Sequence, residues 1–198
     1  TLIAMTALYG GIIGMTAINQ NLANMSNNGK RIAVSPTNRI KIIFSSLLSS
    51  FIVQIIGLFI LFMYTVFALK VDYGNNFPMI ILLSLTGSLA GLSLGLAVGT
   101  IFKTNENLKI GIIIAFTMLG SFLSGMMGIT MKYIIDTNAP IVNKLNPASM
   151  ITDGFYSLYY YGSNLKRFYF NVSSLLIFSL VMIVISMISL RRQKYDSI

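Results

Sequence analysis

Residues 19–41, NQNLANMSNNGKRIAVSPTNRIK, form the longest polar interruption in the first hundred residues of a mostly apolar chain. The stretch carries four basic residues and no acidic one, and apolar runs lie directly before and after it. A short helix is expected over residues 30–34 with a boundary at Pro36, because proline disfavours helical backbone at the residue before it. Ser35 or Thr37 is expected to cap the next helix, which begins near Asn38. The stretch therefore predicts a short helix set crosswise between two long ones.

The composition is that of a membrane protein. Apolar residues make up 55% of the 198 residues and charged residues only 10%, whereas soluble domains carry about 25% charged residues. Several apolar runs exceed the roughly 20 residues that cross the hydrocarbon core of a bilayer. The alternative, a soluble protein with an all-apolar core, is disfavoured by the length of these runs.

The net charge of +9 would suggest nucleic acid as a partner if the chain were soluble. Here the basic residues lie in loops beside the spans, as expected of cytoplasmic loops that face anionic lipid headgroups. We therefore expect membrane lipids and no nucleic acid as partners. The chain has no Cys and no His, which removes disulfides, thiolate nucleophiles and zinc sites with nitrogen and sulfur ligands. No catalytic or metal-binding residue is expected.

Five membrane-spanning helices are predicted, at about residues 2–18, 40–69, 79–102, 110–135 and 168–190. The predicted fold class is all-α, with a single transmembrane domain over residues 1–198. Gly125 and Gly128 are expected to break the fourth span before it reaches the far surface. The segment 137–162 is too polar to span and too apolar for a free loop, so short re-entrant or interfacial helices are expected there. These pieces are expected to be separated by Pro140, Pro147 and Gly154.

Glycines recur at four-residue spacing in the third predicted span. Because glycine destabilises a helix in water, four of them on one face need a reason, and close backbone approach to a neighbouring helix supplies it. Helix packing is the preferred interpretation, and a sliding or gating seam is the alternative. The four residues are Gly87, Gly91, Gly95 and Gly99.

Five spans place the two ends of the chain on opposite sides of the membrane, and they divide the basic residues nine to five. Cytoplasmic loops carry an excess of Lys and Arg, so the richer side is expected to be cytoplasmic. The N-terminus is then outside and the C-terminus inside the cell. The richer side carries Lys30, Arg31, Arg39, Lys41, Lys103, Lys109, Arg191, Arg192 and Lys194.

An internal energy source is not evident in the sequence. No charged residue lies in the middle of a predicted span, which disfavours an ion-coupled transporter. The phosphate-binding loop pattern also fails, because the residue five before Gly29 is Asn24 and not glycine. If this protein moves a substrate uphill, the energy is expected to come from another polypeptide.

Three stretches in order resemble the permease half of type-2 ABC exporters, a family known for drug, antibiotic, peptide and polysaccharide export. The first is NGKRIAVSPTNR (28–39), similar to the family's pattern of Gly, basic, apolar and Ser-Pro residues between its second and third spans. The others are FLSG (122–125), at the break in the family's fifth span, and LNPASMITD (145–153), before its last span. The resemblance covers essentially the whole chain. It implies a chain that lacks the family's first span and its leading amphipathic helix.

The resemblance implies a coupling helix in a cytoplasmic loop, residues 19–41, that docks on a separate nucleotide-binding ABC ATPase subunit. The implied coupling residues are Gly29, Lys30, Arg31, Ile32, Val34, Ser35, Pro36 and Arg39. An outer gate is implied near Ser124, Gly125, Asn146, Pro147 and Asp153. A second permease half, identical or homologous, is expected to complete the pathway for an amphipathic or hydrophobic substrate leaving the cell. This chain is expected to bind no cofactor itself, since the partner subunit binds ATP and Mg²⁺, and to lie in the plasma membrane.

Simpler interpretations stay open for these residues. Lys30, Arg31 and Arg39 also fit a basic loop that fixes topology and contacts lipid phosphates. Asn146, Pro147 and Asp153 also fit the capping of short interfacial helices. Functional alternatives are a stand-alone immunity or sensor protein, a transporter not driven by ATP, and a membrane enzyme that uses the extracellular aspartates.

Overall fold

The computed structural model describes residues 2–35, 37–159 and 165–192, and this part of the chain is helical, without a strand. Five helical segments in it are long and apolar enough to cross a membrane. They are α1 (Leu2–Asn19), α3 (Arg39–Met63) continued by the π-helical turn η1 (Tyr64–Ala68), α4 (Phe77–Ile101), α5 (Glu106–Leu123) and α9 (Leu165–Arg192). The predicted all-α membrane fold with five spans is therefore confirmed.

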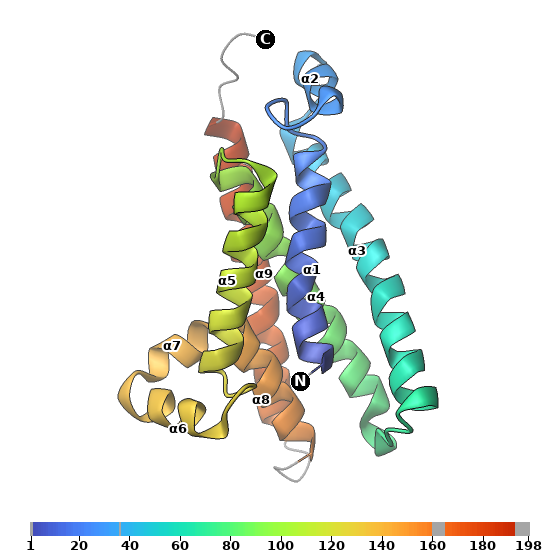
Figure 1. Cartoon of the computed structure of the whole chain (residues 1–198), viewed down its shortest axis with the longest axis vertical. Coiled ribbons are helices and arrows are strands. Elements are labelled where there is room, and N and C mark those ends of the chain that lie inside the picture. Colours follow the sequence, from blue (N-terminus) through green and yellow to red (C-terminus); the bar gives the residue numbers. More distant parts are fainter. Residues whose placement is uncertain (1, 36, 160–164, 193–198) are drawn as a thin grey trace.

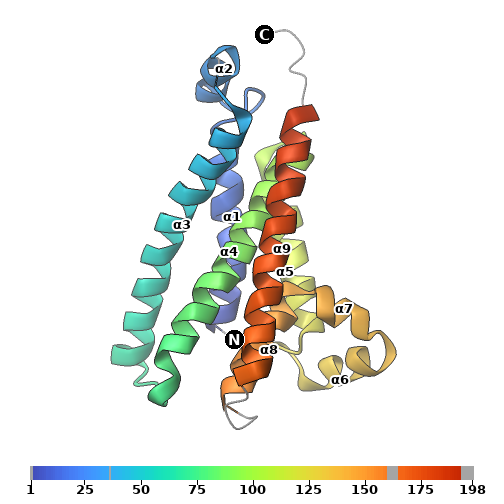
Figure 2. The same cartoon turned by 180° about the vertical axis from the view of Figure 1, so that it is seen from behind.

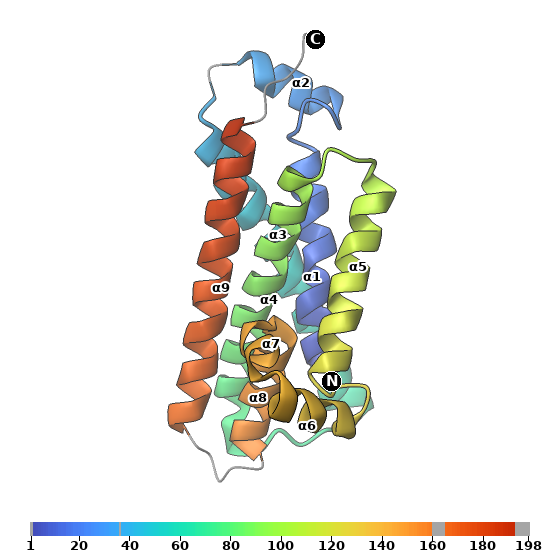
Figure 3. The same ribbon diagram turned by 90° about the vertical axis from the view of Figure 1, so that its left-hand side faces the viewer.

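The long helices run roughly along the long axis of the bundle, each in the opposite direction to the one before it, and the shorter ones gather at the two ends (Figure 1). The helix α2 (Asn27–Val34) lies across one end, close to where α9 ends (Figure 3). At the other end lie α6 (Ile129–Asn138), α7 (Pro140–Leu145) and α8 (Pro147–Tyr159). The turn from α3 to α4 is also at this second end and contains the 3₁₀ turn η2 (Gly74–Asn76).

The helix α4 forms the centre of the bundle, and 72% of the residues in its most apolar stretch are buried. It packs most extensively against α1 and α9, and α9 crosses it on the side seen in Figure 2. At the seam with α1, a Cβ atom on Gly95 would lie 1.8 Å from the carbonyl oxygen of Gly11. A Cβ atom on Gly91 would lie 2.4 Å from the carbonyl oxygen of Ala7. The two backbones are therefore closer than any larger residue permits.

The other two glycines of the stripe also face neighbouring helices. Gly87 lies against Ile151 of α8, and Gly99 lies against Ile18 of α1. The stripe thus lies where α4 packs on two different partners.

The start of α3 differs from the prediction. The Asn38 side chain accepts a hydrogen bond from the Ile40 backbone N–H (3.0 Å) and so caps its own helix. The expectation that Ser35 or Thr37 provides this cap is wrong, because their hydroxyl groups are hydrogen-bonded to each other (2.9 Å). Asparagine is among the strongest N-cap residues, and it stands directly before the first helical residue.

The fourth span is shorter than predicted, because α5 ends at Leu123 and a new helix begins at Ile129. Gly125 has a φ of +81°, a left-handed conformation that glycine adopts without strain and that turns the chain between the two helices. Pro140 and Pro147 each begin a helix, the position that suits a residue without a backbone N–H.

Gly154 does not separate two helical pieces as predicted. It lies inside α8, and a Cβ atom there would come within 2.7 Å of the Leu83 side chain. Its small size permits close packing of α8 on α4, which is a different reason for glycine than a break.

Candidate transport-coupling site

The helix α2 is held in place by residues that precede its exposed surface. The Ser26 hydroxyl accepts a hydrogen bond from the Gly29 N–H (2.8 Å) and donates one to the Gln20 carbonyl (2.6 Å). Ser26 is thus the N-cap of α2 and also fixes it to the end of α1. Gly29 is buried, and a Cβ atom on it would lie 2.1 Å from the carbonyl oxygen of Leu22. Only glycine fits this seat.

Beyond this seat, α2 presents its side chains to the surroundings. Lys30 and Arg31 are exposed, Val34 is 76% exposed, and Ile32 is half-buried. Ser35 is exposed and ends the helix, with its N–H bonded to the Ile32 carbonyl. The predicted coupling residue Pro36 lies outside the described residues. The helix therefore offers a small basic and apolar surface at one end of the bundle.

Arg39 has a different environment from Lys30 and Arg31. It is the first residue of α3, and its guanidinium donates hydrogen bonds to the backbone carbonyls of Leu190 and Arg191 near the end of α9. Cations are favourable near the carboxyl end of a helix, where carbonyl groups have no partners within the helix. Arg39 therefore joins the segment after α2 to the last helix.

A buried lysine lies at the same end of the bundle. Lys109, in the first turn of α5, has no exposed surface, and its Nζ donates to Asn19 Oδ1 and to the Gly99 carbonyl, both at 2.9 Å. These acceptors are the last residue of α1 and a residue in the final turn of α4. One side chain thus connects the ends of three spans.

At the opposite end, Asn146 connects α5 to α8. Its Nδ2 donates to the Gly120 carbonyl (2.8 Å), and its Oδ1 accepts from the Ala148 N–H (3.0 Å). The same amide therefore caps α8, whose first residue is Pro147, and attaches it to the last turn of α5.

The remaining predicted gate residues lie around this connection. Ser124 is fully buried and donates to the Ser121 carbonyl (2.9 Å). Asp153 of α8 forms an ion pair with Lys132 of α6, and the Lys132 ammonium lies 5.2 Å from the centre of the Tyr156 ring. A Cβ atom on Gly125 would lie 2.8 Å from Lys132 Cβ. The structure thus brings all five predicted residues into one joint between α5, α6 and α8.

Comparison with protein-family models matches residues 1–188 to the model described as ABC-2 family transporter protein. The chain belongs to the ABC-2 transporter family. Comparison with curated proteins gives no match, and comparison with solved structures gives none. The family match confirms the resemblance to the permease of ABC-2 type transporters, and the five apolar helices agree with it. This ABC-2 protein is therefore a membrane-embedded transport subunit.

Three connecting residues of this ABC-2 permease were missed at the level of sequence. Lys109 falls just before the predicted start of the fourth span, at residue 110. Asn105 followed by Glu106 is a signal for the start of a helix, and it would have placed Lys109 in the first turn of α5. Asn19 ends α1 and accepts the hydrogen bond of Lys109. Lys132 falls within the predicted fourth span, whereas in the structure it lies on α6 and pairs with Asp153. Among the described residues, no group of acidic side chains is arranged to hold a metal ion.

Proposed function

We propose that this chain is the permease subunit of an ATP-driven exporter and that α2 docks on a separate nucleotide-binding subunit at the cytoplasmic face. One observation carries this proposal. The helix α2 is seated by the contacts of Ser26 and Gly29, yet its outward side chains Lys30, Arg31 and Val34 are exposed. Membership of the ABC-2 family supports it, since permeases of that family typically act with an ABC ATPase.

The bundle offers a route by which movement of α2 reaches the spans. Ser26 attaches α2 to the end of α1, and Arg39 attaches the start of α3 to the end of α9. Lys109 adds the ends of α4 and α5 to the same region. In this proposal, ATP and Mg²⁺ bind to the partner subunit, whose closure displaces α2 and tilts the connected spans.

A second permease half, identical or homologous, completes the pathway in this proposal. Apolar side chains such as Ile114, Phe116 and Leu119 of α5 are exposed in this single chain. The substrate class proposed is amphipathic or hydrophobic. The joint of Ser124, Gly125, Asn146, Pro147 and Asp153 is the proposed outer gate, because a change in the angle between α5 and α8 alters the contacts in it.

The proposal is tested by purifying the tagged chain from its native membranes and identifying co-purifying proteins by mass spectrometry. A nucleotide-binding ATPase subunit is expected, and Arg31→Glu should lower its recovery at least tenfold, which corresponds to about 1.4 kcal/mol. Lys41→Glu is the matched control, because Lys41 is also an exposed base of this region but lies on α3. It should leave the recovery unchanged.

Two results would overturn the proposal. One is purification of the intact chain without any ATPase subunit. The other is an equal loss of recovery with both charge reversals, which would mean that general charge at this end, and not the surface of α2, attracts the partner.

A further inference from the structure

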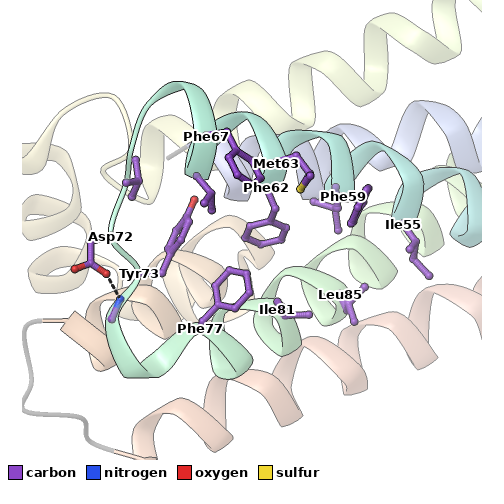
Figure 4. Close-up of a pocket in the computed structure, with 14 residues that line it drawn as sticks. Ile55, Phe59, Phe62, Met63, Phe67, Asp72, Tyr73, Phe77, Ile81 and Leu85 are labelled. Atoms are coloured by element: carbon purple, nitrogen blue, oxygen red, sulfur yellow. Dashed lines mark hydrogen bonds between the residues drawn. The ribbon is translucent and has the colours of Figure 1, made fainter.

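A cavity of about 680 Å³ lies between α3 and α4 at the end of the bundle opposite α2. Its walls are apolar and aromatic, and they come from the last turns of α3, from η1, from the following turn and from the start of α4 (Figure 4). Small-molecule sites in proteins have volumes of about 300–1,000 Å³ and are mostly apolar with a few polar groups. The cavity has both properties.

The cavity is shaped by an unusual piece of helix. At η1 the chain changes to π-helical hydrogen bonding, in which the Leu69 N–H donates to the Tyr64 carbonyl (3.2 Å). Such turns are rare and are frequently found at functional sites. Val66 and Phe67, both within η1, line the cavity.

The turn after η1 is fixed to it by a buried threonine. The Thr65 hydroxyl accepts a hydrogen bond from the Tyr73 hydroxyl (2.7 Å), and the Thr65 carbonyl accepts one from the Val71 N–H (3.0 Å). Tyr73 then packs with Phe62 and Phe77 in an aromatic group, with ring centres 5.5–6.0 Å apart. These contacts hold the aromatic wall in place.

An exposed carboxylate lies at the edge of the cavity (Figure 4). Asp72 lines the cavity at the turn, and its Oδ1 accepts a hydrogen bond from the Gly74 N–H (2.8 Å) (Figure 4). Within the described part of the chain, Asp153 pairs with Lys132, whereas no basic side chain pairs with Asp72. Partial burial, with smaller contributions from Tyr73 and Asp72, raises the pKa of the nearby Tyr159.

We propose that this cavity binds an amphipathic cation, a molecule with one positive charge and an elongated apolar body. The carboxylate of Asp72 attracts the charged group, and the rings of Tyr73 and Phe77 add cation–π attraction. The apolar body lies between the two helices, with Phe59 of α3 on one side and Leu85 of α4 on the other. From Ile55 to Phe67 the α3 wall extends about 18 Å at 1.5 Å per residue, which suits a chain-like body.

The charge at the mouth distinguishes this occupant from an ordinary lipid tail. A groove for lipid tails needs only apolar walls, and a carboxylate at its mouth repels any lipid whose headgroup carries a net negative charge. Phe59 and Phe67 are 63% and 70% exposed, so one wall is open to the bilayer and a ligand can enter from the membrane. This site deepens the proposed export function by naming a substrate class, and it rests on that function only for its biological role.

The chain contains no tryptophan, which permits a site-specific fluorescent reporter. The full chain with Phe59→Trp is reconstituted in phosphatidylcholine nanodiscs and titrated with a tail-brominated dodecyltrimethylammonium, whose bromine quenches nearby tryptophan. Saturable quenching is expected. Adding Asp72→Asn should weaken the binding about two- to fivefold, the range of a single exposed charge pair, whereas Asp72→Glu should retain it. A tail-brominated dodecyl sulfate should bind more weakly than the cation.

A second reporter, Leu180→Trp on the exposed side of α9, measures partition of the probe into the lipid and should show no saturation. Equal affinity for cation and anion, or no effect of Asp72→Asn, would overturn the proposal and leave a groove for lipid tails. Quenching without saturation in the Phe59→Trp variant would overturn it as well. Because no ATPase takes part in this titration, its failure would not affect the test of the α2 interface.

Discussion

At the scale of single residues, the buried amine of Lys109 joins the ends of three helices. Burying such a group costs free energy unless it is hydrogen-bonded, and here two acceptors from different helices satisfy it. The side chain of Asn19, one of those acceptors, is itself buried. Removal of the amine therefore leaves polar atoms in the interior without their donor.

We expect Lys109→Met to lower the stability of the chain by about 1–3 kcal/mol, the cost of leaving a buried acceptor unsatisfied. This corresponds to a fall of about 2–12 °C in the unfolding midpoint for a chain of this size. The measurement is thermal unfolding of the reconstituted protein at a fixed scan rate. Lys103→Met is the control, because Lys103 is exposed, and it should change the midpoint by less than about 2 °C. Equal midpoints for both variants would show that the Lys109 contacts contribute nothing to stability.

At the scale of elements, the seam between α1 and α4 is held by backbone contact rather than by large side chains. In a membrane, lipid tails are as apolar as leucine, so helices associate through close packing of small residues and not through the hydrophobic effect. The approach of Gly95 to the Gly11 carbonyl is the tightest point of this seam among the described glycines. An added methyl group there has to push the two helices apart.

We therefore expect Gly95→Ala to destabilise the bundle by about 1–3 kcal/mol, the usual cost of overpacking. Gly111→Ala in α5 is the matched control, because a Cβ atom there meets nothing within 4 Å. Alanine favours a helix over glycine by up to about 1 kcal/mol, so the control should be as stable as the parent or more so. The checks are the unfolding midpoints of both variants in the same nanodiscs. A Gly95→Ala variant as stable as Gly111→Ala would contradict the close approach of the two backbones at the seam.

The elements themselves were largely predictable from sequence, because span length, apolarity and proline position are local properties. Pro140 and Pro147 begin helices wherever the rest of the chain lies, since the reason is the missing N–H. Gly154 was misjudged because glycine has two uses, a break and a close contact. Only the position of Leu83, far away in sequence, decides between them.

The candidate sites were predictable in position but less so in connection. The exposure of α2 follows from its polar sequence, and its seat follows from Ser26 and Gly29, which lie close together in the chain. Lys109 bonds a residue 90 positions away, and Arg39 bonds residues 151 and 152 positions away. A single sequence contains no local signal for such pairs, so Arg39 was grouped with Lys30 and Arg31 although it contacts α9.

At the scale of the whole molecule, the two ends of the bundle differ in chemical character. The end with α2 also holds the α4–α5 connection and the end of α9 (Figure 1), so Lys30, Arg31, Lys103 and Arg191 lie together there. The opposite end holds α6 and α7 with the ion pair of Lys132 and Asp153. Because Lys and Arg accumulate on the cytoplasmic side, we expect the α2 end to face the cytoplasm.

Single-cysteine variants test this orientation, since the chain contains no cysteine. The Asn28→Cys variant, altered on α2, should be inaccessible to a membrane-impermeant maleimide in intact cells and become labelled after permeabilisation. The Thr137→Cys variant, altered on α6, should be labelled in both conditions. Both parent residues are exposed, so burial does not explain a difference. Labelling of the Asn28→Cys variant in intact cells would reverse the orientation and remove the proposed ATPase interface.

The hydrogen bonds from Arg39 to the last turn of α9 connect two helices through residues that are 151 and 152 positions apart in the sequence. We expect a movement of the start of α3 to reach the end of α9 through these hydrogen bonds, without passing through the helices between them in the sequence. The start of α3 and the end of α9 then either move together or break the hydrogen bonds of Arg39.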